Sequence, residues 1–234
     1  MGCYGKRTTA EVSFFYGGGT ERYGDLYEYT KNDGLLLPSG GFRKLKSFQL
    51  ARLIYDITFR FTNFYIPIGS RTHDQMVQAA RSGAQNIAEG SVDAATSAKS
   101  ELRLYKVAQG SLVELQLDYE DYLRQHQEKI WDRNSPLYNE CIRRRISNAS
   151  EFREFIAWAE NMPPVLNPDR EVPYKSVLVA NAVLLLLNTA IYFLQRQIEY
   201  KENKFCQNGG FSERMYKKRK QNNSENNGGN LPSQ

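Results

Sequence analysis

The sequence predicts an all-α protein, and three observations point to this class. Apolar residues recur at steps of three and four along several long segments. Residues typical of helix caps stand where these segments begin, and proline or glycine follows where they end. The hydrophobic fraction of 41% in 234 residues is large enough for a buried core. We expect a helical bundle domain over residues 42–205, a glycine- and tyrosine-rich extension over residues 1–41, and a basic suffix with a tail over residues 206–234.

The first two helices are predicted on either side of a short break. Residues 43–66 carry an apolar stripe at helical spacing, and the break is Pro67-Ile68-Gly69, where proline and glycine favour a turn. The second helix is expected to start after Thr72 and to reach Gly90 or slightly beyond. Thr72 with Gln75 fits a capping box, in which each residue satisfies a backbone N–H of the other.

Three further helices are expected in the second half of the chain. The first covers residues 97–124. The next begins after Ser135, with Pro136 at its first position, and runs to Asn161. The last covers residues 173–204. Their lengths are typical of helices that lie side by side in a bundle.

The last helix also resembles a membrane span, because residues 177–194 are rich in leucine, valine and alanine. Asn181, Asn188, Gln195 and Glu202, however, recur at steps of seven and keep one polar stripe along the helix. Lipid would surround an isolated span, whereas a bundle helix can turn such a stripe to water or to a neighbour. The stripe favours a bundle helix and no membrane.

Basic charge is concentrated at the end of the chain. The net charge is +5, but residues 201–234 hold seven Lys/Arg and three Asp/Glu, which leaves +1 for residues 1–200. Such an arm attracts nucleic acid or another acidic partner, or only aids solubility. The candidate nucleic-acid-binding residues are the cations of the tail and an arginine run, namely Arg214, Lys217, Lys218, Arg219, Lys220, Arg143, Arg144 and Arg145.

The sequence predicts no catalytic, metal or cofactor site. Neither histidine follows a glutamate by three residues, as a di-iron bundle requires, and no P-loop or nucleophile elbow occurs. Cys141 stands beside the arginine run, which would lower a thiol pKa, but burial in a helix is the favoured alternative. Three cysteines without a CxxC pair and an N-terminus without an apolar core segment favour a reducing cytoplasm.

Residues 76–90 form an unusual segment that is dense in small side chains. Glycine inside a helix costs about 1 kcal/mol relative to alanine, so Gly83 suggests a close neighbouring backbone. The next helix offers a matching run of small residues, Ala108-Gln109-Gly110-Ser111, and the two helices are expected to cross near these small residues. The remaining motif residues are Arg81, Asn86, Glu89 and Gly90. Their polar members could form an internal network, an oligomer contact or a ligand-contacting face, and we favour internal pairing.

Residues 75–90, ending in Asn-Ile-Ala-Glu-Gly, resemble the motif of the four-helix bundle proteins encoded by intervening sequences in 23S ribosomal RNA genes. Residues 108–115 resemble the third helix of that family, and residues 39–46 and 205–219 resemble a bacterial branch with a C-terminal suffix. The resemblance implies an up-and-down four-helix bundle. Residues 135–161 would be an extra inserted helix, and the suffix a short basic helix.

The resemblance also extends to accessory variability proteins of diversity-generating retroelements, which implies a homopentamer that binds a reverse transcriptase and nucleic acid. We therefore expect a non-enzymatic cytoplasmic accessory protein that oligomerises and binds RNA or DNA through basic surfaces. The alternative is a structural or protein-interaction oligomer without a nucleic-acid role, in which the tail only solubilises or docks the chain.

Overall fold

The computed structural model describes residues 41–162 and 172–208, with Glu213, Met215, Tyr216, Lys218, Arg219, Lys220 and Asn223 beyond them. The extension predicted over residues 1–41 lies, except for Gly41, outside the described residues. Within the described residues all regular structure is helical, as the sequence predicts. In chain order it consists of η3 (Gly41–Lys44), α1 (Lys46–Tyr65), α2 (Arg71–Asp93), α3 (Ala98–Gln125), α4 (Pro136–Arg144), α5 (Ala149–Glu160) and α6 (Tyr174–Asn208).

Helix α2 begins two residues earlier than predicted. Its N-cap is Ser70, whose hydroxyl accepts a hydrogen bond from the His73 backbone N–H at 3.2 Å, so Thr72 lies inside the first turn. Gly69 precedes the cap with φ of +85°, a left-handed conformation that glycine adopts without strain. The capping box at Thr72 was therefore wrong, because the turn at Gly69 already aims Ser70 at the free N–H groups of the helix.

The single helix predicted from Ser135 to Asn161 is two helices. Ser135 and Pro136 begin α4 as expected, but Arg145 adopts a left-handed conformation, with φ of 48°, and ends it. Asn148 then caps α5 by accepting hydrogen bonds from the N–H groups of Ser150 and Glu151, both at 3.0 Å. Asn148 is the feature that the sequence interpretation missed, since asparagine favours an N-cap over a helix interior.

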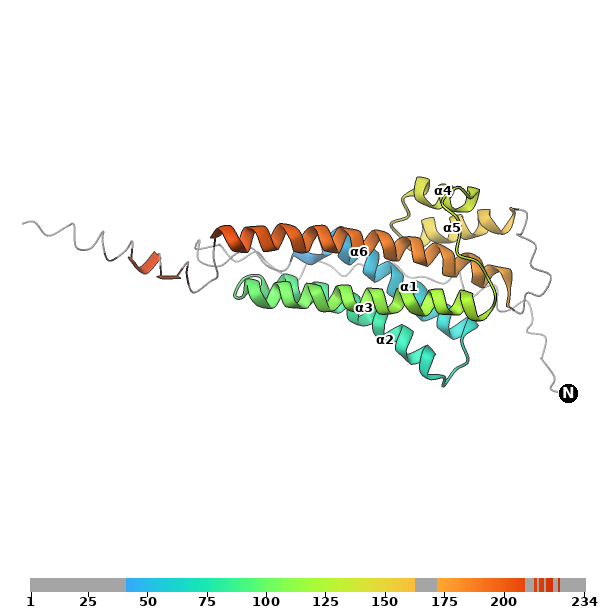
Figure 1. Cartoon of the computed structure of the whole chain (residues 1–234), viewed down its shortest axis with the longest axis horizontal. Helices are drawn as coiled ribbons and strands as arrows, with labels where there is room; N and C mark the ends of the chain where they lie inside the picture. Colours follow the sequence, from blue (N-terminus) through green and yellow to red (C-terminus); the bar gives the residue numbers. More distant parts are fainter. Residues whose placement is uncertain are drawn as a thin grey trace, which may run out of the picture. The chain divides into compact units, whose positions relative to one another are not determined.

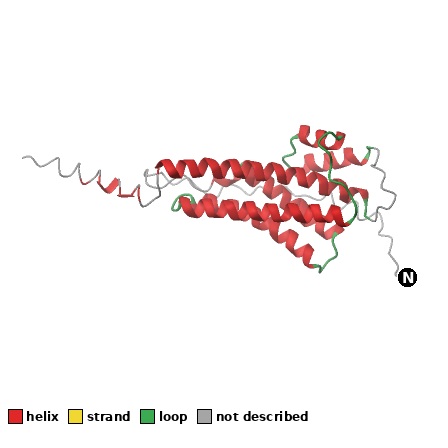
Figure 2. Ribbon diagram, in the orientation of Figure 1, coloured by secondary structure: helices red, strands yellow, loops and turns green. Residues whose placement is uncertain are grey.

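Helices α1, α2, α3 and α6 pack against one another as a helical core, and each contacts two of the others. Figures 1 and 2 show these long helices, with short connections from α1 to α2 and, at residues 94–97, from α2 to α3. Two contacts, one near each end of the helices, show that α3 and α6 run antiparallel. The Tyr122 hydroxyl donates to Ser176 Oγ at 2.9 Å near one end, and Lys106 pairs with Glu202 at 2.8 Å near the other.

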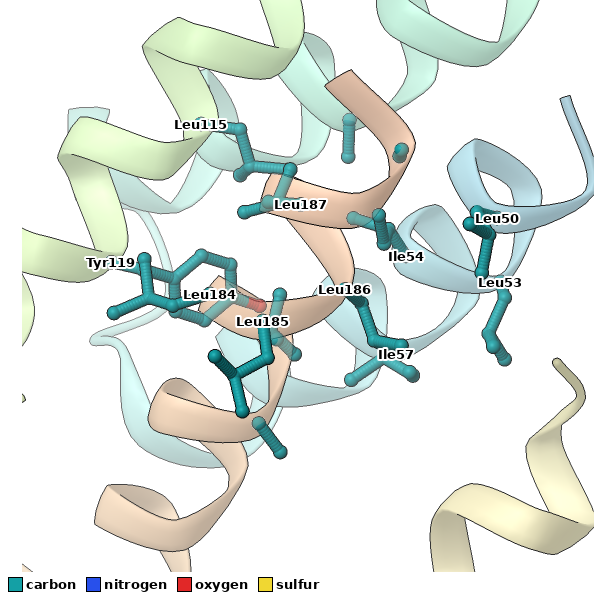
Figure 3. Packing of buried hydrophobic residues seen from close by; sticks show 14 of the residues in the cluster. Leu50, Leu53, Ile54, Ile57, Leu115, Tyr119, Leu184, Leu185, Leu186 and Leu187 are labelled. Atoms are coloured by element: carbon teal, nitrogen blue, oxygen red, sulfur yellow. The ribbon is translucent and has the colours of Figure 1, made fainter. Parts of the chain in front are cut away.

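The hydrophobic core lies between these helices. In Figure 3, Leu184, Leu185, Leu186 and Leu187 of α6 lie between side chains of α1, such as Ile54, and side chains of α3, such as Leu115. The short helices α4 and α5 lie beside the N-terminal half of α6 (Figure 1) and contact it, with Phe155 fully buried. Residues 176–187 of α6 are consequently buried on every side.

Buried polar side chains tie the core helices together at defined levels. Tyr119 of α3 donates a hydrogen bond to Thr58 of α1 at 3.1 Å, inside the core. Asn181 of α6, which is 2% exposed, accepts from the Trp131 backbone N–H at 2.7 Å and holds the loop between α3 and α4. The first member of the predicted polar stripe is thus an internal anchor, while Asn188 and Gln195 are exposed.

Glycines bring α2 and α3 close together, as predicted for Gly83 but not for Gly110. A Cβ on Gly83 would stand 2.6 Å from the Leu112 side chain, and one on Gly90 would stand 2.8 Å from the Tyr105 ring. Gly110 is exposed with nothing within 4 Å, so it lies on the opposite face of α3. The two helices therefore cross near the predicted small residues, since a Cβ on Gly83 would stand 3.8 Å from Ala108 O and Ser82 Oγ lies 2.9 Å from Ser111 Oγ. Gly110 itself does not face α2.

Candidate nucleic-acid interface

The arginine run of residues 143–145 lies at the end of α4 and is partly neutralised by its own helix. Arg143 holds both carboxylate oxygens of Glu140 at 2.7 Å, and Arg144 Nε lies 2.7 Å from Glu140 Oε1. Hydrogen bonds from the two guanidinium groups lower the pKa of Glu140 to about 2. The carboxylate is therefore charged at neutral pH and offsets part of the positive charge.

Arg144 also serves the packing of α4 on α5. Its guanidinium lies 5.2 Å from the Trp158 ring centre and 5.8 Å from that of Phe155, and its side chain is 25% exposed. Arg145 is exposed and makes no ion pair with the described residues. Of the three predicted binding residues, Arg143 and Arg145 are accessible, whereas Arg144 is largely committed to the fold.

The predicted tail residues lie partly within the described residues. Lys218, Arg219 and Lys220 are helical and exposed. Arg214 and Lys217 lie outside the described residues. The prediction that this segment is a short basic helix agrees with the helical residues that the structure describes there.

The polar residues of the α2 motif separate into two groups. Asn86 donates hydrogen bonds to Ser82 O at 2.9 Å and Ser82 Oγ at 3.0 Å, and Ser82 Oγ lies 2.9 Å from Ser111 Oγ of α3. Arg81 and Glu89 are exposed and make no hydrogen bond or ion pair with the described residues. Internal pairing was therefore right for Asn86 and wrong for Arg81 and Glu89, whose side chains are exposed.

A larger group of cations gathers at one end of the helical core. This end contains η3, the start of α1, the end of α2, the start of α3 and the last turns of α6. Ser47 of α1 donates to Gln197 of α6 at 2.8 Å, and Lys201 Nζ lies 2.6 Å from Glu101 Oε1 of α3. We call it the basic end, and its exposed cations are Arg43, Lys44, Lys46, Lys99, Arg103, Lys106 and Lys204.

Acidic side chains offset the basic end only in part. Glu202 pairs with Lys106, and Asp93 accepts a hydrogen bond from Ser100 Oγ at 2.6 Å. Phe42 of η3, Glu89 and Arg103 line an open depression there, of about 470 Å³. Arg43, Lys44, Lys46 and Lys99 make no ion pair with the described residues. Net charges counted over segments of the sequence did not reveal this group of cations, because its members come from helices far apart in the chain.

Beneath the basic end lies a buried polar cluster drawn from the core helices. Glu101 is 2% exposed and Tyr105 1% exposed, and burial together with the Glu101 carboxylate raises the pKa of the Tyr105 hydroxyl. The Glu101–Lys201 pair is a buried charge with its partner at the rim, an arrangement that costs stability when one partner is removed. This cluster holds the end of α6, which leads into the basic tail, against α3.

The other end of α3 is acidic. Asp118 lies near Glu114 and Asp121, and partial burial with these two like charges raises its pKa to about 6. Its Oδ2 atom is buried and accepts no hydrogen bond within the described residues. The helix therefore carries cations at its start and an excess of carboxylates at its end.

The described residues supply little for catalysis. Cys141 is 4% exposed, and burial raises the pKa of its thiol to about 12 despite the nearby Arg144. The favoured burial of this cysteine is confirmed, and the thiol is not activated. No group of three or more His, Cys, Asp or Glu side chains among the described residues is placed to hold a metal ion.

Helix α6 is the one described helix long and apolar enough to cross a membrane by length and composition. Of its most apolar stretch, 72% is buried inside the structure. Its leucines thus already pack against α1, α3 and α5.

Comparisons of the chain with protein-family models, with curated proteins and with solved structures find no match.

Proposed function

We propose that this protein is a non-enzymatic accessory protein that binds the backbone of RNA or DNA through its basic end and its basic tail. The observation that supports the proposal most is the basic end itself. Exposed cations from η3, α1, α3 and α6 lie on one end of the helical core, and only Lys106 among them makes an ion pair with the described residues. Phosphate groups are the ligands that such a surface attracts without requiring a shaped pocket.

The tail adds further cations next to the basic end in the chain. Helix α6 ends at the basic end, and the predicted tail cations follow it in the chain. Arg143 lies on α4 and Arg145 is the C-cap of this helix. Because α4 contacts the other half of α6, we place both arginines outside the main interface. Binding by backbone contacts would make affinity depend steeply on salt and little on base sequence.

As part of this proposal the fold is an up-and-down four-helix bundle of α1, α2, α3 and α6, with α4 and α5 inserted between α3 and α6. The antiparallel contacts of α3 with α6, and the short turns from α1 to α2 and from α2 to α3, support it. Relationship to the intervening-sequence and retroelement accessory proteins, with a reverse transcriptase as partner, also remains a prediction, as does a cytoplasmic location.

Binding is tested by titrating labelled structured RNA and duplex DNA with the full chain at two salt concentrations. The test variant is Arg43→Glu/Lys44→Glu/Lys99→Glu. The matched control reverses three exposed cations at the other end of the core, Arg60→Glu/Arg71→Glu/Lys129→Glu. We expect the test variant to lose at least about tenfold in affinity and the control to lose much less, because only the former removes phosphate partners.

Undetectable binding of the unaltered chain at low salt contradicts the proposal. Equal losses in both variants would mean that net charge alone governs binding. If nucleic-acid binding is contradicted, the alternative is a structural or protein-interaction oligomer, which the exposed apolar residues of α3 favour. Light scattering, which reports the mass in solution, tests self-association separately from nucleic-acid binding.

A further inference from the structure

The outer face of α3 has the residue pattern of a helix that packs against another helix. Along this face, exposed residues follow one another at steps of three and four: Arg103, Lys106, Gly110, Val113, Leu117 and Asp121. This spacing is that of a two-helix seam, in which alternate steps keep the contact on one side. In Figure 1, α3 runs along the front of the helical core with no helix drawn over it.

The middle of this face is apolar although it is exposed. Leu117 is 57% exposed, Val107 47% and Val113 40%, and Gly110 between them has nothing within 4 Å. The inner residues of α3 already pack on α2 and α6. The apolar middle is therefore not needed for packing among the described residues, and a glycine at its centre lets a second backbone approach closely.

Opposite charges occupy the two ends of the same face. Lys99, Arg103 and Lys106 lie before the apolar middle, and Glu114, Asp118 and Asp121 lie within or after it. Lys99 and Arg103 make no ion pair with the described residues. Asp118 has a buried oxygen without a hydrogen-bond donor among the described residues, next to the like charges of Glu114 and Asp121. Lys106 is paired with Glu202 and Asp121 with Arg124, both at 2.8 Å. Lys99 and Arg103 before the middle, and Glu114 and Asp118 after its start, are thus the opposite charges without an ion pair among the described residues.

We propose that two copies of this chain pair through the outer faces of α3 in an antiparallel arrangement about a two-fold axis near Ser111 and Leu112. This orientation sets Gly110 opposite Val113 of the second copy. Arg103 then reaches Asp118 and Asp121 of the second copy, and the same contacts repeat across the axis. A parallel pair would instead set Arg103 against Arg103, which like-charge repulsion opposes.

The pairing goes beyond the proposed function and does not depend on nucleic-acid binding. Because an isologous contact closes at two copies, it predicts a dimer rather than the pentamer that the resemblance implies. The stem of Lys106 can lie over Leu117 of the second copy while its ammonium group stays in water. Since the two copies are antiparallel, their basic ends lie at opposite extremities of the dimer and remain available to nucleic acid.

Light scattering and sedimentation of the full chain over a concentration series up to about 100 μM test the pairing. We expect a mass twice that of the monomer, and at least about tenfold weaker association in Leu117→Asp, because the variant buries a charge in the apolar middle. The matched control is Phe59→Asp, which places the same charge at a 50% exposed aromatic residue of α1. Circular dichroism verifies that both variants keep their helices.

A charge exchange makes the test independent of any folding defect. Arg103→Glu should weaken the dimer, and Arg103→Glu/Asp121→Arg should restore much of it because opposite charges face each other again. Arg81→Glu, on an exposed arginine of α2, controls for the change in net charge. A monomer throughout the series, a five-copy assembly, or a dimer that Leu117→Asp and Arg103→Glu leave unchanged overturns the inference.

Nucleic-acid binding is measured on Leu117→Asp, which keeps every cation of the basic end. A monomeric variant that still binds RNA would support the pairing and leave the proposed function intact. A dimer that binds neither RNA nor DNA would support the pairing while contradicting the nucleic-acid role. The two proposals therefore fail in different measurements.

Discussion

The N-terminal half of α6 and the outer face of α3 differ in how many neighbours cover them. Residues 176–187 of α6 are buried on every side, because α4 and α5 close the face that α1 and α3 leave open. On α3 nothing in the described part of the chain takes that place, and Val107, Val113 and Leu117 stay exposed. An apolar residue on a helix thus indicates a neighbour, which in α6 is another part of the same chain and in α3 is proposed to be a second copy.

The largest loss of stability is expected when the packing of α5 against α6 is disrupted. Phe155→Ala deletes a fully buried ring of α5 and should lower the free energy of unfolding by about 3–5 kcal/mol, because the cavity cannot refill. Urea denaturation followed by circular dichroism measures it. The control is Phe193→Ala, at a 39% exposed position of α6 that α5 does not bury, and its loss should be below about 1.5 kcal/mol. Similar losses in the two variants would contradict the comparison.

The inner and outer faces of α3 should respond oppositely to a methyl group. Gly90→Ala in α2 pushes a Cβ to 2.8 Å from the Tyr105 ring on the inner face, and should cost about 1–3 kcal/mol. Gly110→Ala meets nothing within 4 Å and should stabilise the isolated chain by up to about 1 kcal/mol through helix propensity. Thermal unfolding at low protein concentration compares them. A destabilising Gly110→Ala there would place α3 differently from what we describe.

Two asparagines seven residues apart on α6 allow its covered half to be compared with its exposed half. Asn181→Ala removes the acceptor of the Trp131 N–H and should cost about 1–3 kcal/mol, because the loop then keeps an unpaired donor. Asn188→Ala, at an exposed position of the same helix, should change stability by less than about 0.5 kcal/mol. The urea midpoints of the two variants, measured under the same conditions, give the two losses of stability. An equal effect at both positions would mean that the loop does not depend on Asn181.

The smallest effect concerns pH at the open face of α3. The pKa of Asp118 is raised to about 6 in the folded chain from an ordinary value of 3.8, so the folded state binds the proton more tightly. Its penalty to stability is absent near pH 3, grows as pH rises from about 4 to 6 and is complete above that range. Asp118→Asn should therefore stabilise the monomer at pH 7, by about 1 kcal/mol at most because solvent screens the group, and not near pH 3. Thermal unfolding at both pH values and low concentration measures the difference, and an equal gain at both would exclude ionisation as its cause.

Much of the secondary structure follows from the sequence because its causes are local. The stripe at steps of three and four, Ser135 as a cap and Pro136 at a first helical position all act within a few residues, and the structure bears them out. The two errors, at Ser70 and at Asn148, arose where several residues compete as caps. The geometry of the preceding turn, at Gly69 and at Arg145, selects among them.

The sequence by itself determined that this protein is helical, that α6 is apolar enough to lie in the core or in lipid, and that the tail is basic. Only the tertiary structure decided that Gly83 meets Leu112 while Gly110 faces outward, and that Lys44 and Lys99 belong to one basic end. The physical reason is distance. Periodicity and capping act along a few turns of chain, whereas charge and packing act between residues that the fold brings together from far apart.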